Sequence, residues 1–79
     1  MVEPLYEGPA HGAVFYVPAA GVVRFRFSDS PGGGYVRAHD GVLMRVQSGA
    51  RLFLSAGQHV LSLYDPSMVV RVSIKFWPN

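Results

Sequence analysis

Short runs of alternating apolar and polar residues, each ended by a turn rich in Gly, Pro, Asp or Ser, extend over most of the chain. The turn residues recur roughly every eight to twelve residues, a spacing typical of all-β sandwiches and barrels. No window keeps a helical period, because Gly or Pro interrupts every longer stretch. The pattern therefore predicts an all-β fold, a small antiparallel β-sandwich of about seven short strands, with a barrel as the alternative.

The clearest expected strand is 22–27, in which apolar residues alternate with Arg24 and Arg26. One face of this strand should join the core, and the other should be cationic. The other expected strands are 13–17, 35–38, 42–46, 51–55, 59–64 and 68–77.

Asp40 and Gly41 lie between two apolar runs, which indicates a tight hairpin. In the strand that follows, Val42, Met44 and Val46 are expected to face inward, because alternate residues of a strand point to the same side.

The first twelve residues differ in composition from the rest of the chain. They contain two prolines, two glycines and two glutamates, with Leu5 and Tyr6 as the only large apolar pair. We expect 1–12 to be an extended N-terminal arm and 13–79 to be the β-sandwich domain. On a neighbouring subunit the arm would bury Leu5 and Tyr6, whereas a frayed terminus without a role is the alternative.

Small size and composition together favour association with another chain. A domain of 79 residues buries only about 60% of the surface that its unfolded chain exposes, and the absence of Cys excludes disulfides as a stabilising device. Hydrophobic residues make up 49% and charged residues 15%, so the surface should be unusually apolar, as interaction surfaces are. We expect a homo-oligomer, either a trimer or a dimer.

No set of residues has the spacing of a catalytic, metal or cofactor site. His11, His39 and His59 are far apart in the sequence and have no clustered carboxylates beside them, whereas a zinc site needs about four ligands. The run 32–34 of three glycines lacks the Lys and the helix that a phosphate-binding loop requires, and reads as a loop. Asp and Ser residues fall mainly in expected turns. The chain is therefore expected to be no enzyme and to need no cofactor.

Cationic and aromatic side chains on the polar faces of strands are the candidate functional residues. Six of the seven cations are Arg, which is enriched at protein interfaces. Aromatic residues interleaved with Arg also suit single-stranded nucleic acid, but a net charge of +2 gives a weak field, so a nucleic-acid partner is not expected. A third hypothesis is a sugar-binding module that stacks on Tyr35 and Trp77. The expected contact residues are Arg24, Arg26, Tyr35, Phe53, Arg71 and Trp77, with Lys75 on the same polar faces.

Two segments carry a resemblance to a known family. The strand and turn from Phe15 to Gly21 and the hairpin from Leu54 to Tyr64 resemble small β-sandwich modules of the pre-peptidase C-terminal type. Those modules accompany exported enzymes, whereas this chain shows no attached enzyme and no export signal.

In size, apolar character and expected N-terminal arm the chain is also similar, by architecture alone, to the decoration and cement proteins of bacteriophage capsids. This resemblance implies a non-enzymatic virion component that is made in the host cytoplasm and docks on a larger protein lattice such as a capsid. No signal peptide is expected, because the first residues have neither a basic region nor a hydrophobic segment. No membrane partner is expected either, because no apolar run approaches the ~20 residues that span a bilayer.

Overall fold

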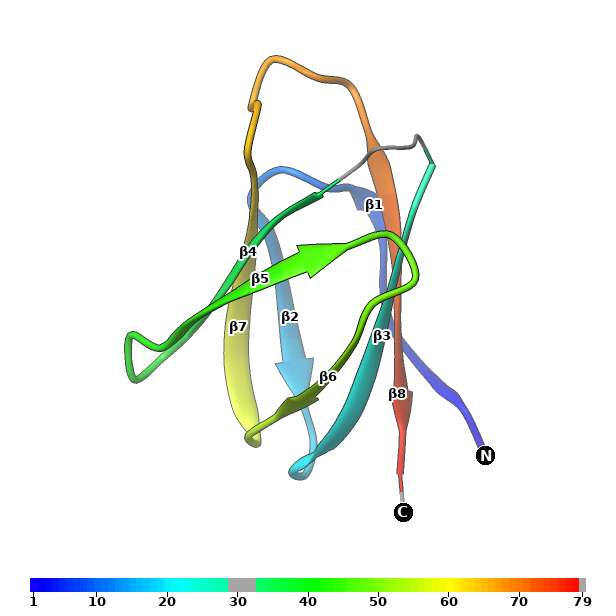
Figure 1. The fold of residues 1–79 in the computed structure, drawn as a ribbon. Helices are drawn as coiled ribbons and strands as arrows, with labels where there is room; N and C mark the ends of the chain where they lie inside the picture. Colours follow the sequence, from blue (N-terminus) through cyan, green and yellow to red (C-terminus); the bar gives the residue numbers. More distant parts are fainter. Residues whose placement is uncertain (29–32, 79) are drawn as a thin grey trace.

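The computed structural model describes residues 1–28 and 33–78, and these form eight β-strands joined by turns (Figure 1). The strands make two four-stranded antiparallel sheets, which confirms the predicted all-β sandwich. In this described part, no helix is long and apolar enough to cross a membrane. The strands are β1 (Glu3–Pro9), β2 (Ala13–Val17), β3 (Gly21–Phe27), β4 (Gly33–Ala38), β5 (Leu43–Gln47), β6 (Arg51–Leu54), β7 (Gly57–Leu63) and β8 (Arg71–Trp77).

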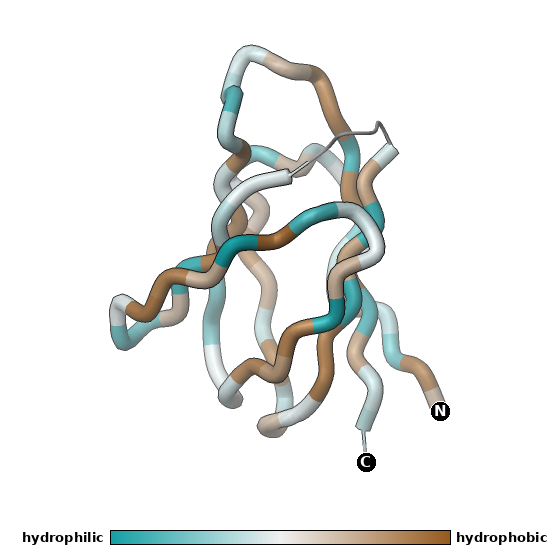
Figure 2. The backbone as a smooth tube through the Cα atoms, viewed as in Figure 1, coloured by the Kyte–Doolittle hydropathy of each residue, from teal (hydrophilic) through white to brown (hydrophobic). Residues whose placement is uncertain are grey.

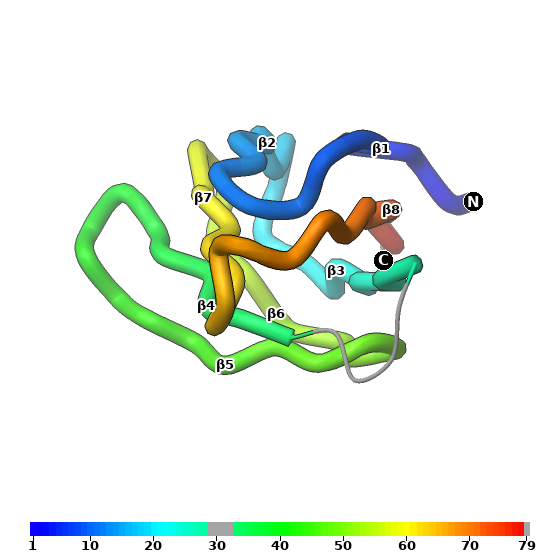
Figure 3. The backbone as a smooth tube through the Cα atoms, turned by 90° about the horizontal axis from the view of Figure 1, so that it is seen from above, coloured from blue at the N-terminus to red at the C-terminus, as the bar shows by residue number. Residues whose placement is uncertain are grey.

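Strand pairing follows one rule along the chain: β1 pairs with β8, β2 with β7, β3 with β6 and β4 with β5. The chain is thus one long antiparallel hairpin, folded so that successive strand pairs fall into different sheets. Sheet A has the order β1-β8-β3-β6, and sheet B has the order β2-β7-β4-β5. This arrangement of eight strands in two packed sheets is a jelly roll, and it answers the choice between sandwich and barrel that the sequence left open. Figure 3 shows β1 and β2 on one side of the sandwich and both chain ends on the sheet A side.

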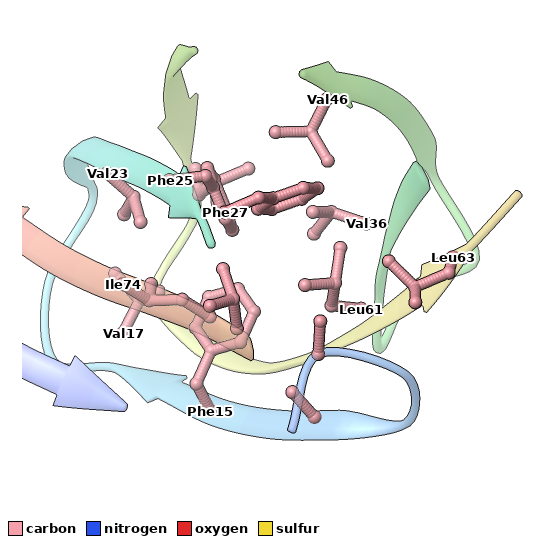
Figure 4. Packing of buried hydrophobic residues seen from close by; sticks show 14 of the residues in the cluster. Phe15, Val17, Val23, Phe25, Phe27, Val36, Val46, Leu61, Leu63 and Ile74 are labelled. Atoms are coloured by element: carbon pink, nitrogen blue, oxygen red, sulfur yellow. The ribbon is translucent and has the colours of Figure 1, made fainter. Parts of the chain in front are cut away.

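Strict alternation of side chains fills the space between the two sheets. Val23, Phe25 and Phe27 of β3 point inward, and the ring of Phe25 meets Phe15 of sheet B edge-on, with centroids 5.8 Å apart (Figure 4). Each fully buried side chain of this size stabilises the fold by about 1.5–3 kcal/mol. The core also includes Val17, Val36, Val46, Leu54, Leu61, Leu63, Val70, Val72, Ile74 and Phe76.

One histidine, His59 of β7, is part of this core and is only 1% exposed. Its Nε2 lies 2.8 Å from the carbonyl oxygen of Ser55, and its ring stacks on Phe15 with centroids 5.6 Å apart. Because a carbonyl oxygen only accepts hydrogen bonds, we assign the proton to Nε2. His59 therefore has a structural role between the two sheets.

The N-terminal segment is not the separate arm that the sequence predicted. Residues Glu3–Pro9 form β1, which pairs with β8 in sheet A, so this segment belongs to the sandwich, which has eight strands in the described part of the chain. Leu5 and Tyr6 are half-buried and pack against the chain's own core, and the Tyr6 hydroxyl donates a hydrogen bond to the Pro9 carbonyl oxygen at 2.7 Å. The two prolines of β1 are tolerated because it is an edge strand.

The glycine run was expected to be a loop, but two of its residues belong to a strand. Gly33 and Gly34 open β4, whereas residues 29–32 lie outside the described part of the chain. Gly34 is buried against β7, and any Cβ at this position would overlap the carbonyl oxygen of Ser62. Close approach of two backbones, not turn formation, therefore explains the glycine at 34.

Two further expectations fail at the ends of strands. Val46 is buried and Met44 half-buried, as expected, but Val42 is 54% exposed because it belongs to the hairpin turn, where its N–H donates to the Asp40 carboxylate. The expected strand 68–77 begins only at Arg71, and Val69 in the preceding loop is 94% exposed. Figure 2 shows both places as hydrophobic segments at the outer ends of the molecule.

Candidate docking surface

The outward face of sheet A gathers most of the positive charge of the chain. Arg24 of β3 lies directly opposite Lys75 of β8 on one side and opposite Arg51 of β6 on the other. Arg26 and Arg71 occupy the same face nearer the other end of the sheet. Five of the seven cations therefore share one face, which we call the cationic face: Arg24, Arg26, Arg51, Arg71 and Lys75.

Apolar side chains form a row beside these cations. The pairing register places Val22 of β3 between Trp77 of β8 and Phe53 of β6. Phe53 is 62% exposed and Trp77 is 38% exposed, so both rings are available to a partner. We call these three residues the apolar row.

Arg24 belongs to the cationic face and also contacts Trp77 of the apolar row. Its guanidinium carbon lies 6.0 Å from the centroid of the Trp77 ring, within the range of a cation–π interaction. Its Nε is buried and has no hydrogen-bond partner among the described residues. Because water cannot reach this nitrogen, the guanidinium is partly desolvated on the side that faces the sheet.

Two shallow depressions lie on this face. One, of about 320 Å³, is lined by Val22, Arg51, Trp77 and Pro78. The other, of about 300 Å³, is lined by Glu7 and by residues of β3 and β8 that include Arg26 and Arg71. Depressions with apolar and Arg walls suit the anchoring side chains of a protein partner.

The structure brings together five of the six surface contact residues that the sequence suggested. Arg24, Arg26, Phe53, Arg71 and Trp77 all lie on the outward face of sheet A. The sequence did not select Arg51, although its alternation with Leu52 placed it on the polar side of its strand. Only the pairing of β6 with β3 reveals that Arg51 adjoins Arg24.

Tyr35 lies elsewhere, on the outward face of sheet B. Its ring meets that of Tyr64 edge-on, with centroids 4.7 Å apart, and it stands opposite Arg45 of β5. Val14, Tyr16 and Leu43 on the same sheet are each more than half exposed. Sheet B thus has an outward face that is more apolar than that of sheet A and holds two cations, Arg37 and Arg45.

Nothing in the described part of the chain resembles a metal centre. Residues 1–28 and 33–78 contain no group of three His, Cys, Asp or Glu side chains that could hold an ion. His11 accepts a hydrogen bond from the Leu63 backbone N–H at 3.2 Å, and the ring of His39 lies beside Gly57. These two histidines, like His59, occupy separate structural positions.

No protein-family model matches the chain, and no curated protein sequence matches it. The fold is similar to that of the C-terminal domain of a structural protein from Sulfolobus turreted icosahedral virus, known from a crystal structure. The TM-score is 0.66, the alignment covers 100% of both chains, and the sequence identity is 12%. At this identity the likeness establishes the fold, and it supports neither the pre-peptidase resemblance nor a bacteriophage origin.

Proposed function

We propose that this chain is a structural component of a virus particle that docks on a larger protein assembly through the cationic face and the apolar row. The jelly roll alone does not decide this, because lectins and cupins share it with viral capsid proteins. The similarity of the whole chain to a domain of a viral structural protein favours the viral reading.

The observation that carries the docking role is the juxtaposition of five cations with exposed Trp77 and Phe53 on one sheet face. Arg and Trp are the residue types that most often dominate the binding energy of protein interfaces. The cationic face would attract an acidic partner over a distance. The apolar row beside it offers apolar surface that the partner buries on contact.

Self-association as a dimer or trimer is part of the proposal. Val14 and Tyr16 lie on the same side of β2, an edge strand of sheet B, and both are more than half exposed. Their exposure supports self-association, because neighbouring exposed apolar side chains on a small domain mark an interaction site. Sedimentation velocity over a range of protein concentrations tests it. An oligomer that dissociates when Val14 and Tyr16 are changed to Ser is the expected result, and a monomer at all concentrations would contradict it.

The experiment for the virion role is to purify particles from cultures of the organism that encodes the chain. Quantitative mass spectrometry should find the chain in the particle fraction, in a fixed ratio to the main shell protein. Recovery only in the free-protein fraction would overturn the proposal.

The sugar-binding hypothesis used Tyr35 and Trp77 as stacking platforms. Tyr35 lies on sheet B and Trp77 on sheet A, so the two rings do not form one shared stacking surface. The structure therefore favours the docking proposal over this alternative.

A further inference from the structure

The low net charge of the chain conceals a strong separation of charge. Of the carboxylates that the structure describes, the register places one on the outward face of sheet A, Glu7 opposite Ser73. Asp40 and Asp65 lie in turns next to strands of sheet B. Glu3 stands opposite Phe76, whose side chain faces the core. Five cations thus share a face with one described carboxylate, although the whole chain carries only +2.

The arrangement of the cations is unfavourable for the isolated domain. Lys75, Arg24 and Arg51 follow one another across three adjacent strands, and like charges directly opposite in a sheet are destabilising. Cross-strand neighbours have Cβ atoms only about 5 Å apart, so each charge raises the energy of the next. Carboxylates of an anionic partner would attract each of these cations and so offset their mutual repulsion.

The neighbouring apolar row indicates that the partner carries an apolar side chain as well as negative charge. Trp77 and Phe53 flank Val22, and the depression beside them is lined by Arg51 as well as by Trp77. A polypeptide can place an apolar side chain in this depression and carboxylates on the cations at the same time. Exclusion of water by the apolar contact would strengthen the ion pairs.

A protein partner fits the shape of the face better than nucleic acid does. Non-specific single-strand binding uses a positive groove that follows the phosphate backbone. Here the charges lie on an open sheet face, with three of them in a row across the strands and Glu7 lining the second depression. Arg, which supplies four of the five cations, pairs through its two-pronged guanidinium with carboxylates and phosphates alike, so the preference for a protein partner rests on the open shape of the face and on the apolar row beside it.

We infer that the cationic face binds a carboxylate-rich segment of a partner protein, with an apolar side chain of that segment seated between Trp77 and Arg51. This inference rests on the proposed docking function and specifies the chemistry of its partner. The charged groups that meet are the guanidinium and ammonium groups of sheet A and the Asp and Glu side chains of the partner.

Trp77 provides the readout, because it is the only Trp of the chain and lies on the face in question. Poly-L-glutamate at low ionic strength should change its fluorescence in a saturable manner. The variant Arg26→Gln/Arg51→Gln should bind at least about tenfold more weakly. The matched control Arg37→Gln/Arg45→Gln removes the same charge from sheet B and should stay within about twofold of the wild type.

Three results would overturn the inference. These are no saturable change in Trp77 fluorescence, equal losses in the two double variants, or tighter binding of a thymidine oligonucleotide of equal charge than of poly-L-glutamate. The last result would assign the face to nucleic acid.

Particle composition separates this inference from the proposed function. A chain that is found in particles but does not bind poly-L-glutamate refutes the inference alone. A chain that binds poly-L-glutamate but is absent from particles refutes the virion role alone.

Discussion

The guanidinium of Arg24 lies 6.0 Å from the centre of the Trp77 ring, and its Nε is buried without a hydrogen-bond partner among the described residues. The two side chains are diagonal neighbours on β3 and β8, since Trp77 stands opposite Val22 and Lys75 opposite Arg24. The Trp77 ring thus contacts the guanidinium of Arg24, which Lys75 and Arg51 on the adjacent strands repel.

The contact between Trp77 and Arg24 should be measurable as stability. Trp77→Ala should lower the free energy of unfolding by about 2 kcal/mol, because the cation–π interaction and part of the buried apolar surface are both lost. Trp77→Phe keeps a ring beside Arg24 and should lose less than about half as much. Urea unfolding followed by circular dichroism compares the two variants, and equal losses would show that the ring makes no specific contribution.

Lys75, Arg24 and Arg51 stand next to one another across three strands, so their mutual repulsion should appear as a gain in stability when one of these charges is removed. Lys75→Gln should raise the free energy of unfolding by about 0.5 kcal/mol at low salt, and the gain should vanish near 1 M salt, where the Debye length is about 3 Å. Arg45→Gln is the matched control, because Arg45 stands opposite Tyr35 and not opposite a cation. Destabilisation by Lys75→Gln at low salt, relative to this control, would contradict the assignment of repulsion.

The close approach of β4 and β7 predicts a severe effect of a single methyl group. Gly34→Ala places a Cβ against the Ser62 carbonyl group, and displacement of backbone in a central strand pair should cost more than about 3 kcal/mol or prevent folding. Gly49→Ala is the control: its φ of 84° is unfavourable for alanine, but its Cβ meets open space, so we expect a loss of about 1–2 kcal/mol. Thermal unfolding of both variants tests the difference, and similar losses would argue against the close approach.

The turn after β7 predicts a small pH dependence of stability. Hydrogen bonds from the Ser67 hydroxyl, at 2.6 Å, and from the Ser67 backbone N–H, at 3.0 Å, stabilise the ionised carboxylate and lower the pKa of Asp65 below its ordinary value. A group with a lower pKa in the folded state stabilises the fold above its unfolded pKa, near 4, and this contribution is lost as the pH falls through the folded pKa.

Ser67→Ala should therefore reduce the loss of melting temperature that the protein shows on acidification below about pH 4. Asp65→Asn should remove the contribution of this residue altogether. Melting temperatures measured across this range check the prediction, and curves parallel to the wild type would show that the hydrogen bonds of Asp65 do not couple to folding.

Within β3 and β8, local alternation in the sequence was enough to predict which residues face outward. It placed Arg24, Arg26, Arg71 and Lys75 on polar faces, and the structure agrees. It could not predict that β3, β8 and β6 are neighbours, because strand order depends on contacts between residues far apart in the chain. For this reason the adjacency of Arg51 and Arg24 was missed.

The failures have identifiable physical causes. Pro4, Gly8 and Pro9 interrupt the alternation of β1, so this segment was read as an arm, although an edge strand can accommodate proline. Gly33 and Gly34 were read as loop because glycine favours turns, whereas the demand for glycine at 34 comes from Ser62, a residue of another strand.

Carbodiimide coupling within purified particles tests the central claim most directly, because this reagent joins an amine to a carboxylate that contacts it. Lys75 is the only lysine of the chain and lies in the middle of sheet A, opposite Arg24. If the cationic face docks on an acidic surface of the virus particle, mass spectrometry should identify peptides in which Lys75 is joined to an Asp or Glu of another particle protein. Absence of the chain from particles, or its presence there with Lys75 uncoupled, would contradict the account.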